Sequence, residues 1–292
     1  MESQNKINKY HFKSGLPQEF EILDIGEVFQ RSKKALTSNH RTDFYQIIWF
    51  KTGNPIHLVD FNPIQIQTNS LLFLNKDMVQ RFDENVMMDG KIILFTDSFF
   101  CRTESDTQFL KNTLLFNDLF SIESLPIQEF TSTFETILKQ MSSELLNEKD
   151  DNQSEILQNL LHNFLLVADR VRKKQNGTEL KKSPELAHVM LFKEHLEAHY
   201  KTKKQVSYYV NELCITEKKL NQATSRILGK QPKKIIDERV MLEAKRILAH
   251  TSKSIKEIGY ELGFEEPTNF VKYFKKHANS TPNEFREKNT LA

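Results

Sequence analysis

The chain has 292 residues, of which 38% are hydrophobic and 27% charged, a balance typical of folded domains and not of a disordered chain. The formal net charge is only +2, and the length favours two domains. Two cysteines, Cys101 and Cys214, exclude a disulfide framework and fit a reducing compartment. Residues 1–6 are polar, unlike a secretory signal, and no apolar run approaches the roughly 18 residues that span a bilayer. We therefore expect a cytoplasmic protein without a membrane partner.

Residues 20–120 have the pattern of short β-strands. Runs of β-branched, aromatic and leucine side chains occupy 44–50, 71–74 and 92–95. Turn-forming residues separate them at 52–55, 62–63, 75–77 and 89–90. Several short strands with turns between them predict a small antiparallel barrel or sandwich.

The apolar period becomes helical from residue 127. A polar break at 147–154 separates two helices, and the second has a stripe wider than one partner helix needs. Residues 170–184 are basic and polar, which predicts a linker, and every later element has a helical pattern. The first helix carries Phe130, Phe134, Ile137, Met141 and Leu145, and the second Ile156, Leu157, Leu160, Leu161, Phe164, Leu165, Ala168 and Val171.

The net charge of +2 hides a division along the chain. Residues 185–292 hold 20 Lys and Arg against 14 Asp and Glu, a net charge of +6, whereas residues 1–184 have a net charge of −4. The C-terminal third is therefore the candidate for a polyanionic partner, although charge alone leaves an ordinary solvated face equally open.

The C-terminal third contains a weak internal duplication. At an offset of 49 residues, Val206, Val210, Leu213 and Ile215 correspond to Ile255, Gly259, Leu262 and Phe264. At an offset of 50, Leu220, Thr224, Leu228, Pro232 and Ile235 correspond to Phe270, Phe274, Ala278, Pro282 and Phe285. We expect two similar helical units, joined by a long helix striped by Ile236, Val240, Ala244 and Ile247.

Each unit has the pattern of helix, short turn and helix. Thr216 and Ser254 are expected N-caps, Gly263 allows a sharp turn, and Pro267 suits a first helical position. Such a pair of helices is the helix-turn-helix geometry, whose second helix enters the major groove of DNA. The residues expected on the outer faces suit that task, because Asn and Gln pair with adenine, Lys reaches guanine and Thr touches a thymine methyl group.

The C-terminal region resembles the DNA-binding domain of the AraC/XylS family of bacterial transcription regulators. The resemblance rests on residues 254–264, on Asn269-Phe270, on 274–276 and 281–286, and on Arg239, Ala244 and Leu248 of the linking helix. Gly259 and Val210 stand where the family usually has alanine, and Cys214 where a small or polar residue is usual. The resemblance implies two units that read neighbouring major-groove segments about one helical turn apart, roughly 34 Å.

Site residues follow from their positions in this motif. Residues expected to contact bases are Lys218, Asn221, Gln222, Thr268, Asn269 and Lys272. Residues expected to contact phosphates are Thr216, Lys219, Arg226, Lys230, Lys275 and Lys276.

The strand-rich segment resembles the cupin-like sensor barrel of the same family. Where metal-binding cupins supply their histidines, this chain has His40 with Thr42, and later Gln80, so we expect no metal and no cofactor. The remaining use of such a barrel is an organic ligand site. The candidate pocket residues are His40, Tyr45, Trp49 and His57, and the alternative is that these side chains fill the core.

The resulting fold class is α+β multidomain. We expect a cupin-like barrel over residues 1–125, a helical pair over 126–174 that forms a homodimer interface, a linker over 175–184 and a double helix-turn-helix domain over 185–292. The alternative for the helical pair is that its stripe packs only on its own barrel.

The expected function is sequence-specific binding of double-stranded DNA to regulate transcription, controlled by a small-molecule effector, with RNA polymerase as a candidate partner. Two alternatives remain: a regulator whose barrel serves only dimerisation, and a cupin enzyme tethered to DNA. Enzymatic activity is not expected, because no Ser/His/Asp or Cys/His arrangement stands at a recognisable spacing.

Overall fold

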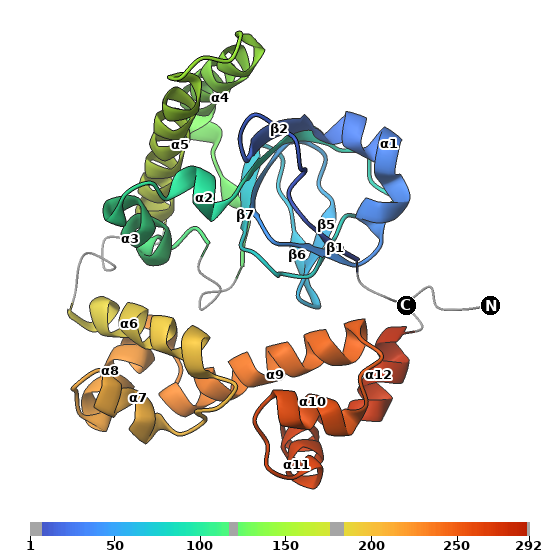
Figure 1. Cartoon of the computed structure of the whole chain (residues 1–292), viewed down its shortest axis with the longest axis vertical. Coiled ribbons are helices and arrows are strands. Elements are labelled where there is room, and N and C mark those ends of the chain that lie inside the picture. Colours follow the sequence, from blue (N-terminus) through green and yellow to red (C-terminus); the bar gives the residue numbers. More distant parts are fainter. Residues whose placement is uncertain (1–7, 117–121, 176–183, 291–292) are drawn as a thin grey trace. The chain divides into compact units, whose positions relative to one another are not determined.

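The computed structural model describes residues 8–116, 122–175 and 184–290 (Figure 1). It forms two compact units, one within Asn8–Glu179 and the other in the chain from Leu180 onward. The first unit is built on β-sheets and the second is helical, which confirms the predicted α+β class. Within these residues, no helix has both the length and the apolar character needed to cross a membrane. Of the predicted linker, residues 176–183 lie outside the described part of the chain. Residues 170–175, whose basic and polar pattern also predicted a linker, are helical instead.

Two five-stranded sheets form the centre of the N-terminal unit. The first, sheet A, has the strand order β1-β3-β8-β5-β6, with β1 and β3 parallel and the other pairs antiparallel. Its strands are β1 (Asn8–Tyr10), β3 (His40–Thr42), β5 (Ile56–Val59), β6 (Asn62–Gln65) and β8 (Gln80–Arg81). The second, sheet B, is antiparallel, in the order β10-β7-β4-β9-β2. Its strands are β2 (Phe20–Asp24), β4 (Tyr45–Thr52), β7 (Ser70–Leu74), β9 (Asp89–Phe95) and β10 (Leu125–Pro126).

Sheet B is covered by an apolar core on each face. Side chains alternate between the two faces of a strand, so neighbouring residues of β4 enter different cores. Ile48 and Phe50 of β4, and Phe44 just before it, face an apolar core that also contains Val59 and Ile64 from sheet A. The alternate residues of β4 and of its neighbours face a second core formed with helices. The two aromatic sets of β4 predicted from the sequence therefore serve two different cores.

Three short helices interrupt the strand-rich segment where the sequence pattern indicated only strands and turns. The longest, α1 (Ile25–Thr37), begins at Asp24, whose side chain accepts hydrogen bonds from the backbone of Gly26 and Glu27. The other two are α2 (Asp97–Phe100) and α3 (Glu104–Asn112), and a capping box of Thr103 and Asp106 starts α3.

The predicted helical pair is present as α4 (Thr131–Leu146), preceded by the 3₁₀ turn η1 (Gln128–Phe130), and α5 (Gln153–Gln175). Its wide stripe packs on sheet B: Phe134 lies between Trp49 and Phe164, and all three are fully buried. The surplus apolar surface that suggested a dimer is therefore used within the unit. The dimer stays a prediction, now resting on exposed residues such as Ile156 and Leu166 of α5.

The C-terminal unit consists of helices among the residues described (Figure 1). They are α6 (Pro184–His199), α7 (Val206–Glu212), α8 (Glu217–Leu228), α9 (Pro232–His250), α10 (Ile255–Glu261), α11 (Pro267–Ala278) and α12 (Pro282–Thr290). Helix α9 is the predicted linking helix, and its expected stripe of Ile236, Val240, Ala244 and Ile247 is buried. It is tied to α6 by the Arg239 guanidinium, which bonds Glu197 at 2.8 Å and stacks 3.9 Å from the ring centre of Tyr200.

Candidate nucleic-acid interface

The two predicted turns have the same backbone hydrogen bonds, shifted by 49 residues. In the first, the N–H groups of Leu213, Cys214 and Ile215 donate to the carbonyls of Tyr209, Asn211 and Val210. In the second, Leu262, Gly263 and Phe264 donate to Ile258, Tyr260 and Gly259, with all six distances between 2.9 and 3.1 Å. The middle residue of each turn is left-handed, with φ of 51° at Cys214 and 71° at Gly263. The duplication read from the sequence is therefore a duplicated helix-turn-helix.

In each helix-turn-helix pair one of the two helices begins at a hydroxyl N-cap, and it is a different helix in each pair. Thr216 caps α8, the second helix of the first unit, by accepting from the Lys219 N–H at 3.2 Å. Ser254 caps α10, the first helix of the second unit, in a capping box with Glu257. Helix α11 begins at Pro267, as the sequence predicted.

Aromatic packing holds α11 against α10. Phe270 and Phe274 are fully buried, and the Phe264 ring lies 5.4 Å from that of Phe270. Gly259 faces the same ring, where a Cβ would stand 3.2 Å from the Cβ of Phe270. These contacts fix which face of α11 is turned outward.

The predicted base-contacting residues lie on the outer faces of α8 and α11. Five of the six are exposed and one is half-buried; they are Lys218, Asn221 (half-buried), Gln222, Thr268, Asn269 and Lys272. On α11 the exposed three occupy the first two turns, the part of a recognition helix that meets base edges.

The predicted phosphate-contacting residues divide into two groups. Thr216, Lys219, Lys275 and Lys276 are exposed. Two others already pair with carboxylates of the chain: Arg226 bonds Glu185 at 3.1 Å, and Lys230 bonds Glu238 at 2.8 Å. These two cations can meet a phosphate only together with their carboxylates or after releasing them.

Two of the four predicted pocket residues lie close together in sheet A. His57 is fully buried and its Nε2 stands 3.0 Å from Oε1 of Gln80, which pairs in register with His40. Burial, opposed only in part by the Gln80 hydrogen bond, lowers the pKa of His57 to about 3. Burial also lowers the pKa of His40. Both imidazoles are thus neutral and held within the sheet.

The other two predicted pocket residues do not share this interior. Tyr45 and Trp49 lie on the opposite face of β4, in the core formed with the helices. Tyr45 stacks on Phe95 at 5.1 Å, and the Trp49 indole donates to Asn69 at 3.1 Å. The prediction of one pocket for all four residues conflicts with this placement, because neighbouring positions 44 and 45 belong to opposite faces.

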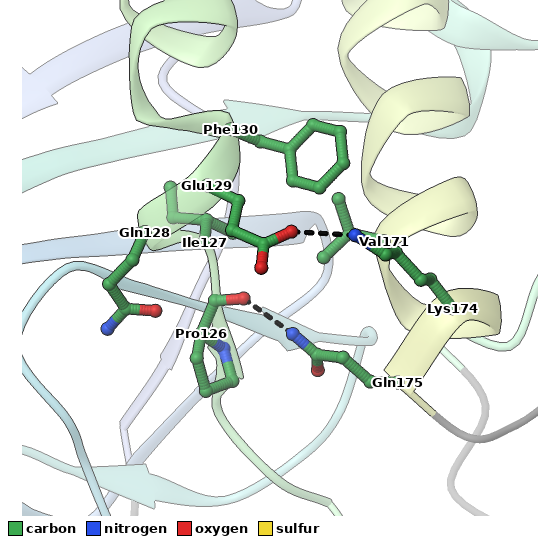
Figure 2. Close-up of a pocket in the computed structure, with 8 residues that line it drawn as sticks. All are labelled: Pro126, Ile127, Gln128, Glu129, Phe130, Val171, Lys174 and Gln175. Carbon is green, nitrogen blue, oxygen red and sulfur yellow. Dashed lines mark hydrogen bonds and ion pairs between the residues drawn. The ribbon is translucent and has the colours of Figure 1, made fainter.

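The structure contains a pocket that the sequence did not indicate, where α5 ends beside η1 (Figure 2). Its volume is about 310 Å³. At its rim the Lys174 ammonium pairs with Glu129 at 2.7 Å, and the Gln175 amide donates to the carbonyl of Pro126 at 2.7 Å. The Phe130 ring and Val171 supply an apolar wall. The pocket thus offers an apolar wall beside one cation and one anion.

A helix-turn-helix domain family matches residues 209–288. The HTH-type transcriptional activator RhaS of Enterobacter sp. (strain 638) is 22% identical over 264 residues, which cover 88% of this chain and 90% of that protein. RhaS of Shigella sonnei is 21% identical with the same coverage. The crystal structure of ToxT from Vibrio cholerae covers 92% of this chain and 98% of its own, at 16% identity and a TM-score of 0.45.

The family match covers both turns described above and the whole of α8 to α11. The RhaS relatives align with both the β-sheet unit and the helical unit, since they cover 88% of the chain. By its turn geometry and by the match over residues 209–288, the C-terminal unit contains a helix-turn-helix domain, and the β-sheet unit and the helical unit together are similar to the RhaS transcriptional activators.

Proposed function

We propose that the protein binds a specific DNA sequence through α8 and α11, which read two neighbouring major-groove segments. The observation that carries this proposal is the repeated turn geometry, which presents exposed Asn, Gln, Lys and Thr side chains on the second helix of each unit. These side chains have the donors and acceptors that base edges require.

The test is footprinting of Asn269→Ala and Lys272→Ala on an operator obtained by selection of bound DNA. Loss of a base contact costs about 1–3 kcal/mol, so we expect roughly five- to hundred-fold weaker binding and relaxed choice at the contacted base pairs. Lys288→Ala, an exposed lysine on α12, is the matched control and keeps wild-type binding. Wild-type footprints from both α11 variants would show that another surface reads the DNA.

We further propose that a small organic effector, bound in the N-terminal unit, controls DNA binding. We also propose that the protein acts in the cytoplasm as a homodimer. Two places are the candidates for the effector: the buried His40, His57 and Gln80 group, and the pocket beside Glu129 and Lys174. The pocket is the better supported, because its volume lies at the lower end of the range for ligand sites, about 300–1,000 Å³. A thermal-shift screen of metabolites with Lys174→Ala and His57→Gln tells the two places apart. A hit abolished only by Lys174→Ala locates the effector in the pocket.

Activation is the proposed direction of regulation, with RNA polymerase as the partner. The support is that the RhaS relatives, which align with 88% of the chain, are named transcriptional activators. Transcription in vitro from a promoter carrying the selected site distinguishes activation from repression. Repression of that promoter would leave DNA binding intact and contradict only this part of the proposal.

A further inference from the structure

The two helix-turn-helix units contact each other directly, in addition to being joined by α9. Lys204 lies in the loop between α6 and α7, in the first unit. Its ammonium donates to the carbonyls of Leu262 at 2.6 Å and Gly263 at 3.3 Å, in the turn of the second unit. It also donates to Lys201 at 2.7 Å and lies 4.6 Å from the ring centre of Phe264. One lysine of the first unit therefore holds the turn of the second.

A second set of hydrogen bonds is connected to Lys204 through Lys233. Asp237, on α9, accepts from the Tyr273 hydroxyl of α11 at 2.8 Å and from Lys233 at 2.6 Å. The Lys233 ammonium also donates to the backbone carbonyl of Lys204 at 3.2 Å. Lys204, Lys233, Asp237 and Tyr273 thus form one connected group, which we call the clamp.

The clamp is buried in part: Lys204 and Tyr273 are half-buried and Asp237 is buried, whereas the Lys233 side chain is exposed. The Tyr273–Asp237 bond, shielded from water, is stronger than a surface pair. Asp237 is 8% exposed. Burial, together with the nearby charge of Lys233, lowers the pKa of Lys204, and burial with the Asp237 hydrogen bond raises the pKa of Tyr273. The backbones also approach closely, because a Cβ at Gly263 would lie 2.1 Å from the carbonyl oxygen of Lys201.

The clamp bears on DNA reading because it joins α11 and the turn before it to the α6–α7 loop, and so to the unit that contains α8. Helix α8 packs on α6 within the first unit, whereas α11 packs on α10 within the second. A linking helix alone can bend, but a contact between the units resists any change in the separation of α8 and α11. We propose that the clamp residues, with Lys204 as the central one, are positioning residues that set the spacing between the two DNA segments the protein accepts. This proposal rests on the proposed function.

The experiment measures the binding of the full chain to three duplexes by fluorescence anisotropy: the selected site, the same site with two base pairs inserted between its halves, and one half alone. Two added base pairs rotate one half by about 70° relative to the other, so we expect at least a tenfold loss for the wild type. The variants are Lys204→Met, which keeps an aliphatic chain over Phe264 without its donors, and Tyr273→Phe, which removes only the hydroxyl. In both, the loss on insertion shrinks to about threefold or less, and binding to the half site is unchanged.

Lys203→Met is the matched control, because it removes a neighbouring exposed lysine that stacks on Tyr208 and stands outside the clamp. It keeps the full penalty for insertion. Circular dichroism checks that each variant is folded, and Tyr273→Phe serves alone if Lys204→Met unfolds. If folded clamp variants keep the wild-type penalty, the clamp does not set the spacing. If the wild type selects no DNA sequence at all, the proposed function itself fails.

Discussion

The two turns of the DNA-binding domain place different residues in the same backbone conformation. Cys214 and Gly263 are equivalent in the duplication, and both are left-handed. A side chain in this conformation costs about 1–2 kcal/mol, which glycine avoids, although glycine loses more freedom on folding. The first turn is therefore strained at a residue whose side chain is exposed.

Cys214→Gly should stabilise the C-terminal domain by about 0.5–1 kcal/mol, because the relief of strain exceeds the entropy cost. Thermal unfolding followed by far-UV circular dichroism measures the gain. Trp49, the single tryptophan, lies in the N-terminal unit. The unfolding transition followed by its fluorescence serves as an internal control and should not change. Gly263→Ala has the opposite sign, because its Cβ would collide with the Lys201 carbonyl. A destabilised Cys214→Gly protein would contradict the proposed strain.

In each unit the departure from the alanine that the resemblance leads one to expect goes with a change in size at a second buried position. In the second unit Gly259 faces the large Phe270. In the first unit the larger Val210 takes the place of Gly259, and the smaller Leu220 takes the place of Phe270. All four residues are buried. The smallest of them, Gly259, is paired with the largest, Phe270, and the larger Val210 is paired with the smaller Leu220.

His57 should make the N-terminal unit less stable in mild acid. Burial holds its pKa at about 3 when folded, against an ordinary value of 6.5, so below pH 6.5 only the unfolded chain binds the proton. Stability is therefore complete above pH 6.5 and falls as the pH drops toward 3. Between pH 7.0 and 5.5 the expected loss from this residue is about 1 kcal/mol.

The measurement is urea unfolding followed by Trp49 fluorescence at both pH values. His57→Gln removes the titrating ring and should reduce the pH-dependent loss by that amount, even though it also lowers stability at pH 7.0. His162→Gln, a half-buried histidine of the same unit, is the comparison variant. An equal pH dependence in wild type and His57→Gln would show that other groups are responsible.

At the scale of elements, the capping box at Ser254 determines where α10 begins. The Ser254 hydroxyl accepts from the Glu257 N–H at 3.2 Å, and the Glu257 carboxylate accepts from the Ser254 N–H at 2.7 Å. Ser254→Ala should cost about 1 kcal/mol of stability in the C-terminal domain. It should also weaken DNA binding, because α10 supports α11. Ser252→Ala, two residues earlier and exposed, should change neither the far-UV unfolding transition nor the affinity; equal effects of both variants would argue against the cap.

Elements defined by local signals could be predicted from the sequence. The caps Thr216 and Ser254, the start of α11 at Pro267 and the buried stripe of α9 all follow from residues within a few positions of one another. The duplication added information, because an offset of 49 residues relates even the turn hydrogen bonds. The start of α1 at Asp24 had a local signal too, but the surrounding strand pattern obscured it.

Features that depend on contacts between distant residues could not be predicted. Alternation separates Phe44 from Tyr45, but it does not tell which face of β4 meets sheet A and which meets the helices. The clamp joins Lys204 to Leu262 across 58 residues, and nothing near either position indicates it. The sequence shows that the apolar stripe of α5 is wide. That this stripe packs on the face of sheet B that carries Tyr45 and Trp49 is seen only in the tertiary structure.

At the scale of the whole molecule, the division of charge governs how DNA binding responds to salt. Each phosphate neutralised by a lysine releases counterions, so the slope of log K against log salt changes by about 0.9 for each contact. The structure separates the predicted phosphate contacts into exposed cations, such as Lys276, and cations paired within the chain, such as Lys230 with Glu238. A paired cation brings its carboxylate to the DNA and so neutralises less phosphate charge.

Lys276→Ala should therefore reduce the magnitude of the slope by about 0.9, with affinity falling similarly for specific and unrelated DNA. Lys230→Ala should reduce it by clearly less, and Glu238→Gln, which frees Lys230, should increase it. Fluorescence anisotropy across a series of salt concentrations gives the three slopes, with Lys288→Ala as the control on α12. The reverse order, with Lys230→Ala changing the slope more than Lys276→Ala, would mean that the DNA follows the face around Glu238 and not the end of α11. The ion pairs within the chain would then be the part of the surface that DNA binding rearranges.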